Sequence, residues 1–209
     1  MTSIMFTIGW ALVGAAAGWF VRWGSVRLAR LEGLEPGNRR WQVFGPPILA
    51  AALLGVFAFH FGPTPELFVR SFFVLVLVQV IFFDFEHRLI LDRVMFPSMA
   101  LALVVSLFDH PWWTHLAAGL GAGLLFLLLA LAGSAIFKAE ALGFGDVKLA
   151  VFMGLLLGPL ATAQAIFYGV FLAGLVSVGF IVWNRSLKGT IAYGPYLAAG
   201  TVIVLFLLS

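Results

Sequence analysis

The sequence predicts an all-α protein, a polytopic membrane bundle of about eight transmembrane helices in a single membrane-embedded domain over residues 1–209. Of its 209 residues, 63% are hydrophobic and only 10% are charged, whereas soluble domains average about 25% charged residues. A soluble fold of this length has too little interior to hide so much apolar surface. Apolar runs long enough to cross a bilayer, about 17–25 residues, recur along the whole chain. Lipid is therefore the predicted solvent.

Apolar runs predict the individual spans. In chain order they cover residues 4–21, 44–61, 67–83, 89–108, 113–137, two spans within 149–183, and 196–208. The stretch 149–183 is divided at Gly158–Pro159, because a proline after a glycine ends a helix; one long kinked helix is the alternative. The first run lacks a preceding positive segment and its basic residues follow it, so we expect a retained span and not a signal peptide.

Basic residues predict the orientation, because Lys and Arg stay on the cytoplasmic side during insertion. Eleven of the twelve fall in alternate connections, and Arg70 is the exception. This alternation fits eight spans with both termini outside, whereas a single kinked helix would put Arg185 and Lys188 on the opposite side. Residues 22–43 are then a short basic cytoplasmic loop, long enough for an interfacial amphipathic helix that ends near Gly37.

Composition also excludes several kinds of chemistry. The chain has no cysteine, which excludes disulfides, thiolate catalysis and cysteine-ligated zinc. Its four histidines lack metal-site spacing, so we predict no metal site. The net charge of +3 does not indicate nucleic acid, because the basic residues are few and spread among short loops. The bilayer is the partner that the composition predicts.

The acidic residues are not spread evenly. Five of the nine fall in two connections, both predicted to be cytoplasmic: Asp84, Glu86, Asp92, Glu140 and Asp146. Asp84 directly follows the third apolar run, and Asp146 opens the sixth. Gly143 and Gly145 precede Asp146 and let the backbone bend or approach another chain closely. Two segments that carry carboxylates could therefore meet at one face of the membrane.

Two close carboxylates cannot both ionise easily, so they share a proton. An aspartic protease uses this state, with one carboxylate as the base that activates water and the other as the acid. The spacing alone leaves other interpretations open. Asp84 and Asp146 could pair with Arg88 and Lys148 at the interface. A small proton-coupled transporter could use the same aspartates, although transporter sites usually lie near the midplane, and a non-catalytic scaffold needs neither.

Three segments carry a resemblance to a known family. "GFGDVKL" at 143–149 resembles the GxGDxKL motif of type IV prepilin peptidases, which are GxGD membrane aspartic proteases. "FFDFEHRLILDRVMFP" at 82–97 is similar to the family's first aspartate segment, with Leu91 where proline is usual, and "IAYGPYLAAG" at 191–200 is similar to an element near its last span. The resemblance implies that Asp84 and Asp146 are catalytic. The motif positions of the family correspond to Gly143, Gly145 and Lys148. Three further acids could bind the substrate by attracting a basic leader: Glu86, Asp92 and Glu140.

The resemblance implies an endopeptidase that removes the leader from type IV prepilin or pseudopilin precursors at the cytoplasmic face of the inner membrane. Relatives often carry two CxxC pairs for zinc in the first cytoplasmic loop, and this chain has none. Proteolysis needs no cofactor. S-adenosylmethionine would be one only if the methyltransferase activity of many relatives is retained.

Overall fold

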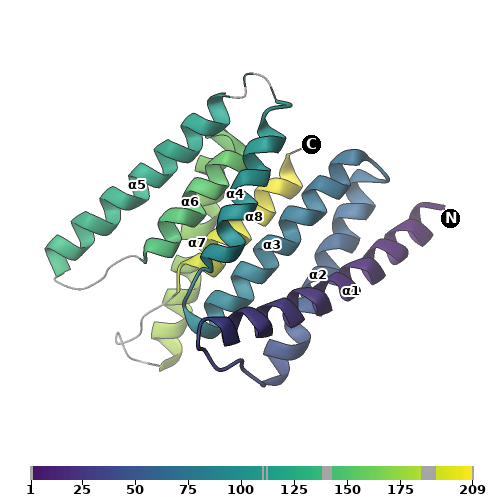
Figure 1. Cartoon of the computed structure of the whole chain (residues 1–209), viewed down its shortest axis with the longest axis horizontal. Helices are drawn as coiled ribbons and strands as arrows, with labels where there is room; N and C mark the ends of the chain where they lie inside the picture. The colour runs from purple at the N-terminus through teal and green to yellow at the C-terminus, as the bar shows by residue number, and fades with distance from the viewer. Residues whose placement is uncertain (1, 110, 112, 138–142, 185–191, 209) are drawn as a thin grey trace. The chain divides into compact units, whose positions relative to one another are not determined.

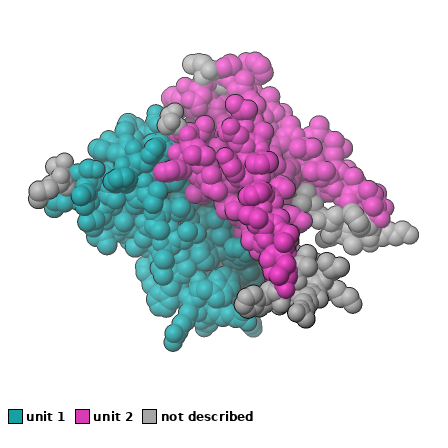
Figure 2. All heavy atoms as spheres, turned by 180° about the vertical axis from the view of Figure 1, so that it is seen from behind, with its two compact units in different colours: residues 1–88 teal, residues 89–209 magenta. Residues whose placement is uncertain are grey.

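The computed structural model describes residues 2–109, 111, 113–137, 143–184 and 192–208, and every regular element among them is an α-helix (Figure 1). The chain divides into two compact units, Met1–Arg88 and Leu89–Ser209 (Figure 2). The helices are α1 (Thr2–Leu31), α2 (Arg40–Phe61), α3 (Pro65–His87), α4 (Asp92–Ser106), α5 (Trp113–Phe137), α6 (Phe144–Leu157), α7 (Pro159–Asn184) and α8 (Gly194–Leu207). The predicted all-helical class is confirmed.

Small residues let α1 and α2 pack closely in the first unit. A Cβ added at Gly14 would lie 2.7 Å from the carbonyl oxygen of Ala50, and one added at Gly18 would lie 2.4 Å from Cα of Pro47. The paired positions rise along α1 and fall along α2, so the two helices are antiparallel. In lipid, no hydrophobic effect drives helices together, so close van der Waals packing at small residues stabilises their association.

The third helix completes the first unit. Thr64 caps α3, because its side chain accepts a hydrogen bond from the Leu67 N–H over 3.3 Å. Near the same end, Trp10 of α1 donates through Nε1 to the hydroxyl of Ser71 over 3.0 Å. The helix ends at Arg88, which has a left-handed conformation with φ 53° and whose N–H donates to the carbonyl oxygen of Asp84. These contacts hold α3 from its first turn to its last.

In the second unit, α6 contacts α4, α5, α7 and α8. It approaches α5 closely, because a Cβ on Gly154 would lie 2.4 Å from Cα of Gly119. The pair α7 and α8 is similarly close, since a Cβ on Gly200 would lie 2.3 Å from the carbonyl oxygen of Ala165. The second unit is thus also built on small-residue contacts.

Among the described residues, five helices are long and apolar enough to cross a membrane, namely α1, α2, α3, α5 and α7. The others have 15, 14 and 14 residues, shorter than the roughly 17–25 that a spanning helix needs. Exposed apolar side chains such as Phe20, Leu128 and Phe171 form a surface suited to lipid. The chain is therefore a multi-pass membrane protein, and its orientation stays a prediction.

Two expectations about helix bounds have clear outcomes. The break at Gly158 is confirmed, because this residue has φ 74° and separates α6 from α7. The bound at residue 21 is wrong, because α1 continues through the basic segment to Leu31 and no separate helix ends near Gly37. Gly33, with φ 71°, supplies the left-handed residue that commonly ends a helix.

Candidate active site

Asp84 lies in the last turn of α3, four residues before the residue that caps the helix. It is 6% exposed, and its carbonyl oxygen accepts the hydrogen bond from Arg88 N–H over 2.8 Å. The helix reaches this point as a long apolar run, and Glu86 and His87 are polar residues of its last turn. The sequence therefore places a buried carboxyl group at the polar end of a membrane helix.

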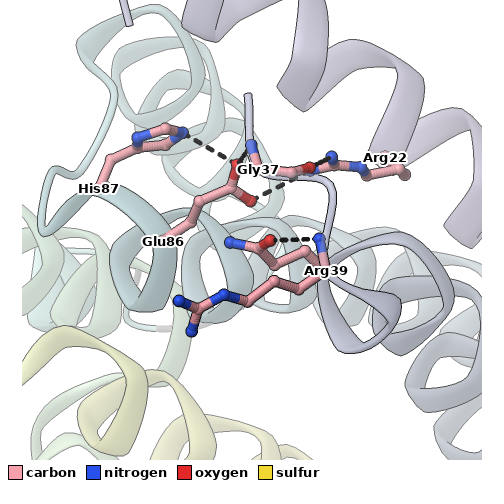
Figure 3. Close-up of polar contacts among 6 residues, drawn as sticks. Arg22, Gly37, Arg39, Glu86 and His87 are labelled. Carbon is pink, nitrogen blue, oxygen red and sulfur yellow. Dashed lines mark hydrogen bonds and ion pairs between the residues drawn. The ribbon is translucent and has the colours of Figure 1, made fainter. Parts of the chain in front are cut away.

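Glu86 is bound within the first unit (Figure 3). Its Oε2 accepts from Arg22 Nη1 of α1 over 3.1 Å, and its Oε1 accepts from the backbone N–H of Gly37. His87 Nε2 lies 3.2 Å from the same Oε1. Glu86 follows Asp84 by two residues, and both of its carboxylate oxygens have partners. The role of Glu86 in attracting a leader stays a prediction.

Asp146 lies in the first turn of α6, where Gly143 is the N-cap. It precedes the apolar run that begins at Leu149, in a helix too short to cross a bilayer alone. Burial raises the pKa of the Asp146 carboxyl to about 6, while the hydrogen bond from the Gly143 backbone lowers it. The side chain at this position of a helix commonly accepts the N-cap N–H. Asp146 is thus a buried acid whose pKa is raised to about 6.

Lys148 pairs with Asp92 in the second unit and not with Asp146, contrary to the ion-pair interpretation of the sequence. Its Nζ donates to Asp92 Oδ1, which joins α6 to the first turn of α4. The ammonium also lies over the rings of Phe144 and Phe96, at 5.1 Å and 5.5 Å from their centroids. The two predicted motif residues Lys148 and Asp92 therefore meet in space.

The two motif glycines have different surroundings. A Cβ on Gly145 would lie 3.0 Å from Cβ of Ile90, in the connection that precedes α4. Gly143 is exposed, and a Cβ there would meet nothing closer than Asp146 Oδ2 at 3.6 Å. A side chain at position 145 would thus press on Ile90, whereas Gly143 leaves open space beside Asp146. Glu140, also predicted for this site, lies outside the described residues.

Sequence reasoning missed Arg22 and Gly37 as parts of this region. The sequence predicts only a role in membrane topology for Arg22, whereas its side chain is 9% exposed and pairs with Glu86. The sequence feature that points to such a pair is Glu86, because a carboxylate beside a membrane span needs a cation as its partner. The approach of Asp84 to Asp146 stays a prediction.

Zinc does not fit the residues that the structure describes. The sequence has no cysteine, and no group of three or more His, Asp or Glu side chains in the described part of the chain could hold a metal ion.

The fold and the buried carboxyl groups define a class, a polytopic helical membrane protein with candidate acid–base residues at helix ends. A family model described as the type IV leader peptidase family matches residues 71–178, just over half of the chain. The chain belongs to this family and is a membrane peptidase. No curated protein and no solved structure matches it.

Proposed function

We propose that the protein is an aspartic endopeptidase in which Asp84 and Asp146 are the two catalytic carboxyl groups. One observation carries the proposal: the family match over residues 71–178 contains both aspartates. Their burial supports it, because 6% and 9% exposure are unusual for ionisable side chains without a specific role. Each also lies at a helix end, where a peptide can approach from the polar side.

In the proposed reaction, the ionised carboxylate takes a proton from water while the water oxygen attacks the scissile carbonyl carbon. The protonated carboxyl gives its proton to the carbonyl oxygen, and a tetrahedral diol forms. The C–N bond then breaks as the nitrogen takes up the proton that came from water, and one diol hydroxyl returns a proton to the other carboxylate. The raised pKa of Asp146 favours this residue as the initial acid.

The substrates of this proposal are type IV prepilin or pseudopilin precursors, cut at the cytoplasmic face of the inner membrane. Family membership supports leader peptides as the substrate class. The alternation of basic connections supports the cytoplasmic face. Asp92, 54% exposed in its side chain, supports attraction of a basic leader, and open space at Gly143 supports an extended peptide beside Asp146.

Co-expression of a prepilin with the wild-type chain, Asp84→Asn and Asp146→Asn tests the proposal. We expect each variant to lose leader removal by at least about 100-fold, since a positioned acid or base contributes about 10²–10⁴-fold. Asp109→Asn is the control, because this aspartate is 65% exposed in its side chain and precedes α5. Normal processing by either active-site variant would overturn the assignment. Mass spectrometry of the product N-terminus reports any methylation in the same sample.

A further inference from the structure

Arg22, Gly37 and Glu86 form a closed set of contacts within the first unit (Figure 3). Arg22 Nη1 donates to Glu86 Oε2 over 3.1 Å, and Arg22 Nη2 donates to the carbonyl oxygen of Gly37. The Gly37 N–H donates to Glu86 Oε1. Each member thus contacts the other two, and they come from α1, the connection between α1 and α2, and α3.

Both charged side chains of this set are buried, with exposures of 9% for Arg22 and 6% for Glu86. Burying an ion pair costs desolvation that its attraction often only offsets, so stability alone is a weak explanation for it. A buried ion pair does favour one arrangement over others, because either charge left unpaired is costly. The arrangement favoured here includes the Gly37 backbone, whose N–H and C=O are both bound.

The set acts on the turn that carries Asp84. Glu86 follows Asp84 by two residues, and the helix ends at the bond from Arg88 N–H to the Asp84 carbonyl oxygen. Terminal helical turns lack part of their internal hydrogen bonding and open most easily. A contact that holds Glu86 from two neighbouring segments therefore restricts the movement of Asp84.

We propose that Glu86 is a positioning residue: with Arg22, it holds the Gly37 backbone against the last turn of α3 and so fixes the Asp84 carboxyl group. The inference rests on the proposed function, in which Asp84 is catalytic. It is an alternative to the predicted role of Glu86 in attracting a leader, because a carboxylate with both oxygens bound inside the unit presents little charge to a substrate. Misplacement of a catalytic group by about 1 Å can cost about 100-fold in rate.

The test uses the full chain, reconstituted in lipid vesicles, and measures kcat and KM for a prepilin. Glu86→Gln removes the charge, and Arg22→Lys keeps the charge but cannot bind Glu86 and Gly37 as a guanidinium does. We expect kcat to fall about 10–100-fold for Glu86→Gln and less for Arg22→Lys, with KM within about twofold of wild type. The control is Glu66→Gln, which breaks the ion pair with Arg70 in the first turn of the same helix. It should leave kcat unchanged.

A charge-swapped double variant, Arg22→Glu with Glu86→Arg, separates positioning from simple ion pairing. It restores the attraction between α1 and α3, but arginine has no acceptor for the Gly37 N–H and glutamate has no donor for its carbonyl oxygen. We therefore expect thermal stability to recover relative to Glu86→Gln while kcat stays low. Recovery of kcat to the wild-type value would overturn the proposal. So would a rise in KM at unchanged kcat in Glu86→Gln, which would indicate leader binding.

A second measurement does not depend on cleavage. Because the chain has no cysteine, Leu34→Cys introduces a single thiol at a half-buried position of the same connection. We expect Glu86→Gln to raise the rate of maleimide labelling at this thiol several-fold. An unchanged labelling rate would overturn the proposal that Glu86 holds the connection between α1 and α2. If wild-type protein cleaves no precursor, the proposed function fails, whereas the labelling result still decides whether Glu86 holds Gly37.

Discussion

Lys148 Nζ donates to Asp92 Oδ1, and this contact joins the first turns of α6 and α4. The Asp92 side chain is 54% exposed, so the ion pair contributes at most about 1 kcal/mol. Each ring that faces the ammonium adds about 0.5–1 kcal/mol. We expect Lys148→Met to lower the free energy of unfolding by about 1–3 kcal/mol and Asp92→Asn by less than about 1 kcal/mol.

Denaturant titration in detergent, followed by circular dichroism, measures both values. Phe96→Leu is the control, because it removes one aromatic ring and leaves the ion pair. If Asp92→Asn destabilised the chain more than Lys148→Met, the ion pair would dominate over the rings, and the reasoning from exposure would be wrong.

The two motif glycines should respond differently to alanine. A Cβ on Gly145 would press on Ile90 at 3.0 Å, whereas one on Gly143 meets no atom closer than 3.6 Å. We expect Gly145→Ala to lower the melting temperature by several degrees, since a crowded core position costs about 1–3 kcal/mol. Gly143→Ala should lower the melting temperature by less, since Ala is only a poorer N-cap than Gly there, and it should raise KM, because the methyl group enters the space proposed for the peptide. Equal melting temperatures for the two variants would contradict this difference.

Contact between α5 and α6 should depend on Gly154. A Cβ there would lie 2.4 Å from Cα of Gly119, and backbone atoms cannot move aside cheaply. We expect Gly154→Ala to destabilise the second unit by more than about 3 kcal/mol, at the upper end of the overpacking range. Gly121→Ala on α5 is the matched control, because nothing lies within 4 Å of its Cβ position. We expect Gly121→Ala to leave the free energy of unfolding unchanged or to raise it by up to about 1 kcal/mol.

Thermal unfolding of both variants in the same detergent checks the pair. Helix interfaces in membranes use small residues to bring backbones together, so the sign of the alanine effect reports which glycine lies at an interface. A destabilising effect of the same size at Gly121 would place that residue at a contact that the described structure does not have.

Local chemistry explains which parts of the fold the sequence predicts. Gly158 and Pro159 mark the break between α6 and α7 because one adopts positive φ and the other begins a helix. The end of α1 was not predicted at Leu31, because Arg22 ends the apolar run but does not end a helix. Hydropathy locates the lipid boundary, whereas helix ends depend on backbone conformation, here at Gly33.

The candidate site divides in the same way. Asp84, Asp146 and the motif glycines lie in short segments that can be recognised by their local pattern. The pairing of Arg22 with Glu86 joins residues 64 positions apart, and nothing local specifies the register of α1 against α3. That register follows from packing, so only the structure shows that Arg22 belongs beside the turn of Asp84.

Protonation of Asp146 should make stability depend on pH. Burial raises the pKa of this carboxyl from 3.8 to about 6, so the folded chain binds the proton more tightly than the unfolded chain. The stabilisation by this proton is fully present below pH 3.8 and is lost as the pH rises through about 6. A rise of this size corresponds to about 3 kcal/mol. We expect the melting temperature of wild type to fall between about pH 4.5 and 7.5.

Asp146→Asn cannot titrate at this position, so its melting temperature should fall less over the same pH range. Glu35→Gln, which changes an exposed carboxylate, should follow the wild type. Differential scanning fluorimetry in one detergent at several pH values compares the three proteins. If Asp146→Asn loses as much stability with rising pH as the wild type, another group accounts for the titration, and the raised pKa of Asp146 would no longer support its role as the initial acid.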